Sequence, residues 1–119
     1  RALAAMDLFM LASRMEGLPN VLVEAQLMGV PVLCTGVGGM TETFVPGETG
    51  AIASGESPVL FAEAATGMLS DIEGLARMSA SAAAFSRQQF SIGRMCDRMV
   101  AAYERASGAR RQVKEERRV

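Results

Sequence analysis

The sequence predicts an α/β domain: part of a Rossmann-like parallel sheet with helical crossovers, followed by a helical C-terminal segment. Three observations lead to this prediction. Short apolar runs alternate with helical patterns in the first half of the chain, glycine and proline separate these segments, and from residue 57 onward the apolar residues keep helical spacing. Short apolar runs between helices are typical of strands buried on both faces, as in parallel sheets.

The first predicted strand is Asp7–Leu11, a short and mostly apolar run. A loop over Ser13–Asn20 follows. Asn20 is a good N-cap because its side chain can accept a hydrogen bond from a free backbone N–H group. The predicted helix is then Val21–Met28, and Gly29 ends it because glycine adopts the left-handed conformation without steric cost.

A second strand is predicted over Val32–Thr35, after Pro31 has stopped any continuation of the helix. The glycine-rich stretch GVGGM then leads to a brief helix around Thr41–Val45. The turn Pro46–Gly50 introduces a third short strand, Ala51–Ala53. This order of strand, helix, strand, short helix and strand is typical of parallel strands joined by crossovers.

The rest of the chain predicts three helices. The first begins near Pro58 and the second spans about Ile72–Arg87. Ser91 caps the third, whose apolar face comprises Ile92, Met95, Met99, Ala102 and Tyr103. We assign residues 1–106 to the domain and 107–119 to a charged tail that is expected to fray. The arginines of this tail are interpreted as a solvated helix end, with contact to an acidic membrane surface or partner as the alternative.

Composition excludes several classes of function. The chain has 119 residues, enough for one modest domain, and its 12 basic and 13 acidic side chains predict no general attraction to nucleic acid. No apolar run reaches the roughly 20 residues of a membrane span, and no targeting segment opens the chain, which is therefore interpreted as intracellular. Cys34 and Cys96 are far apart and histidine is absent, so neither a zinc site, a disulfide framework nor a histidine base is predicted. The opening residues begin in the middle of a pattern, which indicates a fragment or trimmed domain.

A glutamate in the first predicted helix raises a chemical question. At about 100° per residue, Glu24 lies between Leu27 and Met28 and therefore within an apolar surface. An isolated carboxylate there is costly unless it is paired or hydrogen-bonded. Two interpretations remain open: backbone donors and the helix dipole hold Glu24, or Glu24 points into a ligand crevice beyond the carboxyl ends of the strands.

In such a crevice, a carboxylate can accept hydrogen bonds from two neighbouring hydroxyl groups of a ribose or sugar ring. Glu16, in the loop before the same helix, would stand further along the ligand. The free N–H groups at the helix start between them suit a diphosphate. Elsewhere, Gly38 and Gly39 either form a plain tight turn or let the backbone approach a ligand.

These residues belong to a stretch with a recognisable resemblance. The segment SRMEGLPNVLVEAQLMGVPVLCTGVGGMTETFVPGETG resembles the donor-binding region of family-four retaining glycosyltransferases of the GT-B architecture. The matching features are two glutamates separated by seven residues, then GVPVLCT, then GVGG followed by Glu42, and the GETG turn. The later QQFSIGRMCDRMVAAYER resembles the closing helix of the same domain, so the resemblance covers roughly residues 5–105.

The resemblance implies roles for individual residues. Glu16 would be the catalytic-site glutamate that contacts hydroxyls of the transferred sugar, and Glu24 would hold the ribose of the nucleotide. The backbone amides expected near the sugar and diphosphate are those of Gly17, Leu18, Asn20 and Val21. Pro19 stands where many members have glycine, so the phosphate contact is expected to shift toward Asn20 and Val21.

The resemblance also implies the reaction and its partners. We expect transfer of a sugar from a UDP- or GDP-linked donor to a carbohydrate or lipid-linked acceptor, in the synthesis of a cell-surface polysaccharide or glycoconjugate. No Asp-x-Asp pattern occurs, so no metal or other cofactor is expected. The expected location is the cytoplasm, with the inner face of the membrane as the alternative.

Some parts of such an enzyme are missing from the 119 residues. The basic pair that neutralises the leaving diphosphate and the acceptor-side residues lie outside them, so the isolated chain is expected to be inactive. Self-association through an exposed sheet edge is expected if the chain folds alone. Two other interpretations of the function remain open: a non-catalytic binding or assembly module, and a sugar-nucleotide epimerase of similar build.

Overall fold

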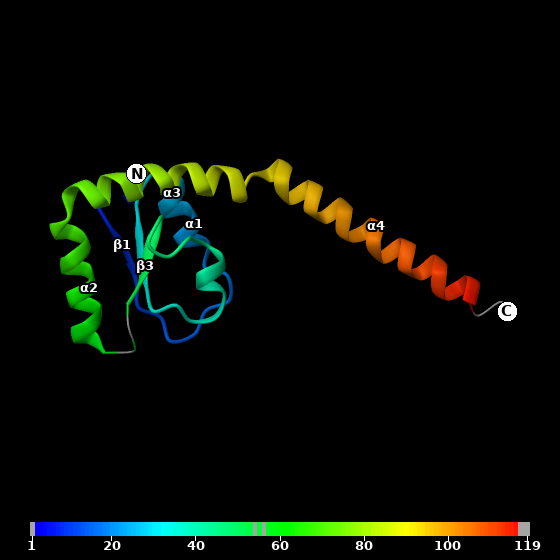
Figure 1. Ribbon diagram of the computed structural model, residues 1–119, viewed down its shortest axis with the longest axis horizontal. Helices are drawn as coiled ribbons and strands as arrows, with labels where there is room; N and C mark the ends of the chain where they lie inside the picture. The colour runs from blue at the N-terminus through cyan, green and yellow to red at the C-terminus, as the bar shows by residue number, and fades with distance from the viewer. Residues whose placement is uncertain (1, 54, 56, 117–119) are drawn as a thin grey trace. The chain divides into compact units, whose positions relative to one another are not determined.

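The computed structural model describes residues 2–53, 55 and 57–116, and the side chains of these residues up to 108. The chain divides into two compact units, Arg1–Gln88 and Gln89–Val119. The first unit contains the sheet and the second consists of one long helix (Figure 1).

Three parallel strands form the sheet, as the sequence predicted. They are β1 (Phe9–Leu11), β2 (Val32–Cys34) and β3 (Gly50–Ile52), in the spatial order β1-β2-β3. Each strand differs slightly from its predicted bounds. The hydrogen bonding between β1 and β2 continues one residue beyond the end of β2, where Thr35 N donates to Leu11 O at 3.3 Å. The α/β class is therefore confirmed.

The helix between β1 and β2 is α1 (Asn20–Leu27), and it begins one residue earlier than predicted. The N-cap prediction for Asn20 was wrong: Pro19 occupies that position with an extended backbone, and no side chain caps the helix. Pro19 O accepts the first turn's hydrogen bond from Leu22 N at 3.1 Å. Gly29 has a φ of 76°, which confirms its predicted role as the left-handed terminator.

The sheet is covered on both faces, which explains why its strands are short and apolar. All three residues of β2 are buried. Val32 and Cys34 pack with Leu22 of α1, whereas Leu33 packs on the opposite face with Ala65 of α2 (Pro58–Ser70). Figure 1 accordingly shows the sheet with α2 along one side. The alternation of side chains along β2 therefore divides the core into two clusters.

The helical segments largely follow the prediction. In α2, Pro58 occupies the first turn, and α3 spans Ile72–Gln89. Helix α4 (Ile92–Glu116) follows Ser91, whose Oγ caps it by accepting a hydrogen bond from Arg94 N at 3.2 Å. The helix continues through residues 107–116, so the expected fraying does not begin at Ser107, and residues 117–119 lie outside the described range. The proposed boundary between residues 106 and 107 thus falls inside a continuous helix.

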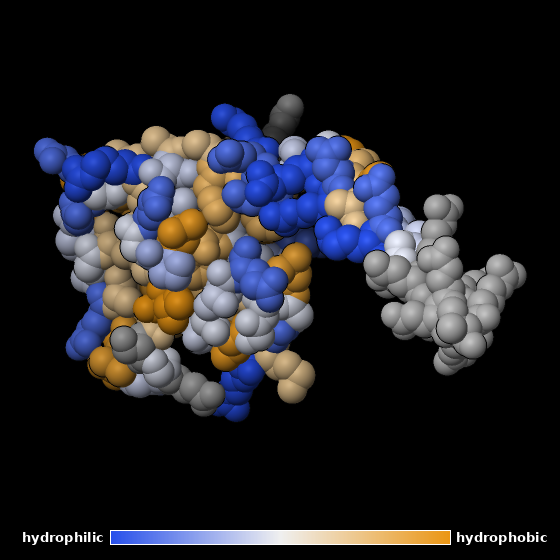
Figure 2. Space-filling view, turned by 45° about the vertical axis from the view of Figure 1, so that its right-hand side comes forward, coloured by the Kyte–Doolittle hydropathy of each residue, from blue (hydrophilic) through white to orange (hydrophobic). Residues whose placement is uncertain are grey.

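Many large apolar side chains are exposed in both units. The predicted apolar face of α4 is exposed at Ile92, Met95, Met99 and Tyr103. In the first unit, hydrophobic residues are visible at the surface among hydrophilic ones (Figure 2).

Met10 on β1 is 53% exposed, and β1 is an edge strand within the described sheet. Self-association through this edge remains a prediction. Among the described helices, none combines the length and apolar character needed to span a bilayer.

The two cysteines differ in environment. Cys34 is buried on β2 and Cys96 is exposed on α4, and both are free thiols. Burial raises the pKa of the Cys34 thiol, with a weaker opposing effect of a backbone hydrogen bond from Gly36. Because the thiolate is the reactive species, we predict that iodoacetamide at pH 8 modifies Cys96 in the native protein and reaches Cys34 only on unfolding. Peptide mapping by mass spectrometry checks this, and equal modification rates would contradict the buried position of Cys34.

Candidate functional site

Two loops meet at the carboxyl ends of β1 and β2, where parallel sheets commonly place their ligand sites. One is the β1–α1 loop (residues 12–19) and the other is the glycine loop (residues 36–39). Gly39 N donates a hydrogen bond to Gly17 O at 2.8 Å. The glycine loop leads into a 3₁₀ helix, η2 (Gly38–Glu42). This helix lies earlier in the chain than the short helix predicted around Thr41–Val45. The two loops therefore form one connected unit.

The glycine loop approaches the β1–α1 loop so closely that side chains do not fit between them. A Cβ atom at Gly38 would overlap Glu16 O, and one at Gly39 would overlap Gly17 O. Gly38 also has a φ of 57°. These glycines thus have a further role that the sequence did not suggest. They allow a direct contact between the two backbones, which fixes the position of Glu16 and Gly17.

Glu16 is half-buried, and its carboxylate is held at one oxygen. Ser13 Oγ donates a hydrogen bond of 2.6 Å to Glu16 Oε1. The Oε2 atom has no hydrogen-bond partner among the described residues, so it is available to a hydroxyl group of a ligand. The predicted site glutamate is thus restrained both at its backbone and at its carboxylate.

Glu24 lies on the exposed side of α1, which contradicts its predicted place in an apolar surface. The buried residues of α1 are Leu22, Val23, Ala25 and Gln26. The desolvation cost that the sequence suggested for Glu24 therefore does not arise. Within the described part of the chain, no hydrogen bond or ion pair reaches the Glu24 carboxylate, which also removes the interpretation that backbone donors hold it. Its carboxylate is accessible to a ligand.

The remaining predicted residues surround the start of α1. Gly17, Leu18 and Asn20 are exposed, and Val21 is half-buried. Since α1 begins at Asn20 and Leu22 N already bonds to Pro19 O, the N–H groups left without a partner within the helix are those of Asn20 and Val21. They lie directly after the loop that carries Glu16. In the described residues, no cluster of three acidic or cysteine side chains lies close enough to hold a metal ion.

Sequence reasoning missed Gln26, the polar side chain that α1 does bury. Gln26 is fully buried, and its Nε2 donates to Leu22 O at 3.0 Å and to Thr43 O at 2.8 Å. The second bond joins α1 to the chain just after η2. The available signal was an amide within the almost wholly apolar run VLVEAQLM. Gln26 thus links the helix of the site to the segment that carries the glycine loop.

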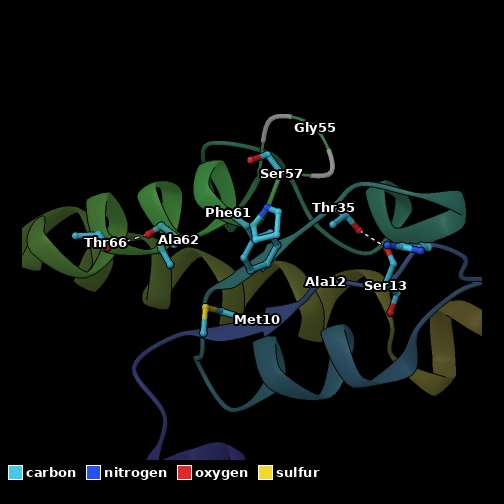
Figure 3. Close-up of a pocket in the computed structure, with 12 residues that line it drawn as sticks. Met10, Ala12, Ser13, Thr35, Gly55, Ser57, Phe61, Ala62 and Thr66 are labelled. Carbon is cyan, nitrogen blue, oxygen red and sulfur yellow. Dashed lines mark hydrogen bonds between the residues drawn. The ribbon is translucent and has the colours of Figure 1, made fainter.

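A pocket of about 560 Å³ lies beside this unit, between the ends of β1 and β2 and the start of α2 (Figure 3). Its wall includes Met10, Ser13, Arg14, Thr35 and Phe61. Neither Glu16 nor Glu24 lines it. Met10 contributes to this wall from the edge strand β1. The structure thus connects Ser13 with both the pocket and Glu16, but it does not place the two glutamates in this pocket.

The sequence is similar to those of known proteins. Residues 1–71 match the model of the family described as glycosyl transferases group 1. The mannosyltransferase LpsB of lipopolysaccharide core biosynthesis from Rhizobium meliloti is 34% identical over 102 residues, which are 84% of this chain and 29% of LpsB. The Vi polysaccharide biosynthesis protein VipC/TviE of Salmonella typhi is 56% identical over 50 residues, which are 42% of this chain and 9% of that protein. The chain thus spans less than a third of the length of the curated relatives it matches.

Solved structures show the same fold. Sucrose-phosphate synthase from Thermosynechococcus elongatus aligns with a TM-score of 0.80 at 23% identity, over 91% of this chain and 27% of that one. Anabaena Alr3699/HepE, crystallised in complex with UDP-glucose, aligns with a TM-score of 0.73 at 28% identity, over 87% of this chain and 29% of its own. Together with the match of the family model over more than half of the sequence, these findings confirm the resemblance, and the chain belongs to the glycosyl transferases group 1 family.

Proposed function

We propose that this chain is part of the donor-binding domain of a longer retaining glycosyltransferase that transfers a sugar from a nucleotide-sugar to an acceptor hydroxyl. The observation that carries the proposal is the joined loop unit. It holds Glu16 in place beside the start of a helix that also carries the accessible Glu24. The complex of the relative HepE with UDP-glucose supports a nucleotide-sugar as the ligand class.

Each residue of the unit has a role in this proposal. Glu16 accepts a hydrogen bond from a hydroxyl of the transferred sugar through its unpaired Oε2, and Glu24 accepts hydrogen bonds from the ribose hydroxyls. The first N–H groups of α1, at Asn20 and Val21, face the diphosphate because a helix start attracts anions. Gly17 and Leu18 contribute backbone amides between the two glutamates.

We further propose that the whole protein acts in the synthesis of a cell-surface polysaccharide or glycoconjugate. The names of the relatives VipC/TviE and LpsB, which refer to Vi polysaccharide and lipopolysaccharide core biosynthesis, support this role. The acceptor in this proposal is a carbohydrate or lipid-linked sugar, and the reaction takes place in the cytoplasm or at the inner face of the membrane. It uses no metal ion.

The two glutamates give the test. In the full-length protein, Glu24→Ala is expected to weaken UDP- or GDP-sugar binding about 10- to 100-fold, because up to two hydrogen bonds to a charged group are lost. Glu16→Ala is expected to lower kcat more than it lowers the affinity for the free nucleotide, because Glu16 contacts the sugar. Calorimetry with UDP, GDP and their sugars, together with transfer assays, measures both effects.

Glu63→Ala is the matched control, since Glu63 is an exposed glutamate on α2. It is expected to leave both properties unchanged. The absence of binding heat with every donor in the unaltered protein would instead indicate a non-catalytic module. Unchanged binding and transfer in both site variants would refute the assignment of the glutamates.

A further inference from the structure

We propose that Thr35 and Ser13 are positioning residues for Glu16, and that their two hydroxyl groups set the direction of the Glu16 carboxylate toward the transferred sugar. This inference rests on the proposed function, which gives Glu16 its contact with the sugar. Neither hydroxyl is assigned a contact with the ligand. They act by restricting the loop and the side chain that make that contact.

The first hydrogen bond joins the ends of two neighbouring strands. Thr35 directly follows β2, and its backbone N donates to Leu11 O of β1 at 3.3 Å, so its backbone is part of the sheet. Its Oγ1 donates to Ser13 O at 2.6 Å (Figure 3). Thr35 therefore ties the beginning of the β1–α1 loop to the rigid sheet across a sequence separation of 22 residues.

The second hydrogen bond reaches the carboxylate itself. Ser13 Oγ donates to Glu16 Oε1 at 2.6 Å, a short distance that is typical of a hydroxyl bound to a charged oxygen. Ser13 thus uses its carbonyl to accept from Thr35 and its hydroxyl to donate to Glu16. The hydrogen bond to Oε1 restricts rotation of the carboxylate and therefore the directions in which Oε2 can point.

A third contact restrains the backbone of the same glutamate. The backbone of Gly38 packs against the Glu16 carbonyl, as described above. Glu16 is therefore held at its backbone by the glycine loop and at its carboxylate by Ser13, although the surrounding residues Met15, Gly17 and Leu18 are exposed. Such restraint matches what a group that must meet a reacting sugar requires.

Loss of this restraint is expected to affect turnover more than nucleotide binding. The nucleotide is bound by Glu24 and the helix start in the proposed function, whereas the two hydroxyls bond to Ser13 O and to Glu16 Oε1. In the full-length protein, Ser13→Ala and Thr35→Val are therefore expected to lower kcat by roughly 10- to 100-fold. The affinity for the free nucleotide is expected to change by less than about twofold. Thr35→Ser keeps the hydroxyl and is expected to restore most of the activity.

A matched control and a measure of folding separate this effect from general destabilisation. Ser70→Ala removes a hydroxyl that bonds only within α2, and it is expected to leave kcat unchanged. Turnover is expressed per nucleotide-binding site measured by calorimetry, so an unfolded fraction does not lower the value. An equal loss of activity in Thr35→Val and Thr35→Ser would overturn the role of the hydroxyl.

A double-mutant cycle with Glu16→Ala tests whether Ser13 acts through Glu16. Ser13→Ala is expected to have little further effect once Glu16 is alanine. Full additivity, or normal turnover in Ser13→Ala and Thr35→Val while Glu16→Ala is impaired, would overturn this inference and leave the proposed function standing. Normal turnover in Glu16→Ala itself would instead overturn the proposed function.

Discussion

Gly38→Ala is expected to disrupt the site more than any other single methyl group added to this chain, with a loss of at least about 3 kcal/mol of local stability. Its Cβ would overlap Glu16 O, a backbone atom that cannot move aside without shifting the β1–α1 loop. Hydrogen exchange at the amides of residues 12–19 measures the local opening free energy. Donor binding and transfer in the full-length protein are expected to fall together, because Glu16 and Gly17 are displaced.

Gly47→Ala is the control that isolates the overlap. Gly47 has a φ of 81°, so alanine there has the same unfavourable backbone region, but no atom lies within 4 Å of an added Cβ. Its expected cost is only the roughly 1–2 kcal/mol of a left-handed alanine. Equal effects of the two substitutions would show that the contact between the loops is not what makes glycine necessary at Gly38.

Gln26→Ala is expected to destabilise the same region by about 3–5 kcal/mol. The substitution removes the hydrogen bond from Nε2 to the carbonyl of Thr43, leaves that buried oxygen without this donor and opens a cavity beside α1. Because the lost bond joins α1 to the segment after η2, the glycine loop is expected to loosen as well. Hydrogen exchange at the amides of α1 and of residues 36–43 measures both effects.

Gln26→Met separates the hydrogen bonds from the volume, since methionine fills a similar space without polar atoms. The Oε1 atom of Gln26 is buried and has no partner among the described residues, so its removal offsets part of the loss. Gln26→Met is therefore expected to cost less than Gln26→Ala. Equal costs for the two substitutions would mean that the amide bonds, rather than the packing, dominate at this position.

Much of the fold follows from local signals. The apolar runs that became β1 and β2, the left-handed Gly29 and the cap at Ser91 depend on residues close in sequence, and the structure confirms them. The first and last residues of the elements were predicted less accurately than the elements themselves. The start of α1 moved to Asn20 because Pro19 already supplies the extended backbone and the carbonyl that a helix start needs.

The candidate site was predicted only in part. The spacing of Glu16 and Glu24 and the motifs around them identified the family, and the family model confirms that identification. The burial of the polar side chains of α1 was not predicted correctly. Periodicity placed Glu24 among apolar neighbours and gave no role to Gln26, yet the structure exposes the first and buries the second.

The sequence by itself determined the order of the elements, the parallel sheet and the membership of the family, because these depend on periodicity, turn residues and motif spacing along the chain. Only the tertiary structure decided which polar side chain of α1 is buried, why Gly38 must be glycine and what holds Glu16. The physical reason is that these properties depend on contacts between segments far apart in sequence. The 22-residue separation of the Thr35–Ser13 hydrogen bond and the 17-residue separation of the Gln26–Thr43 bond are examples.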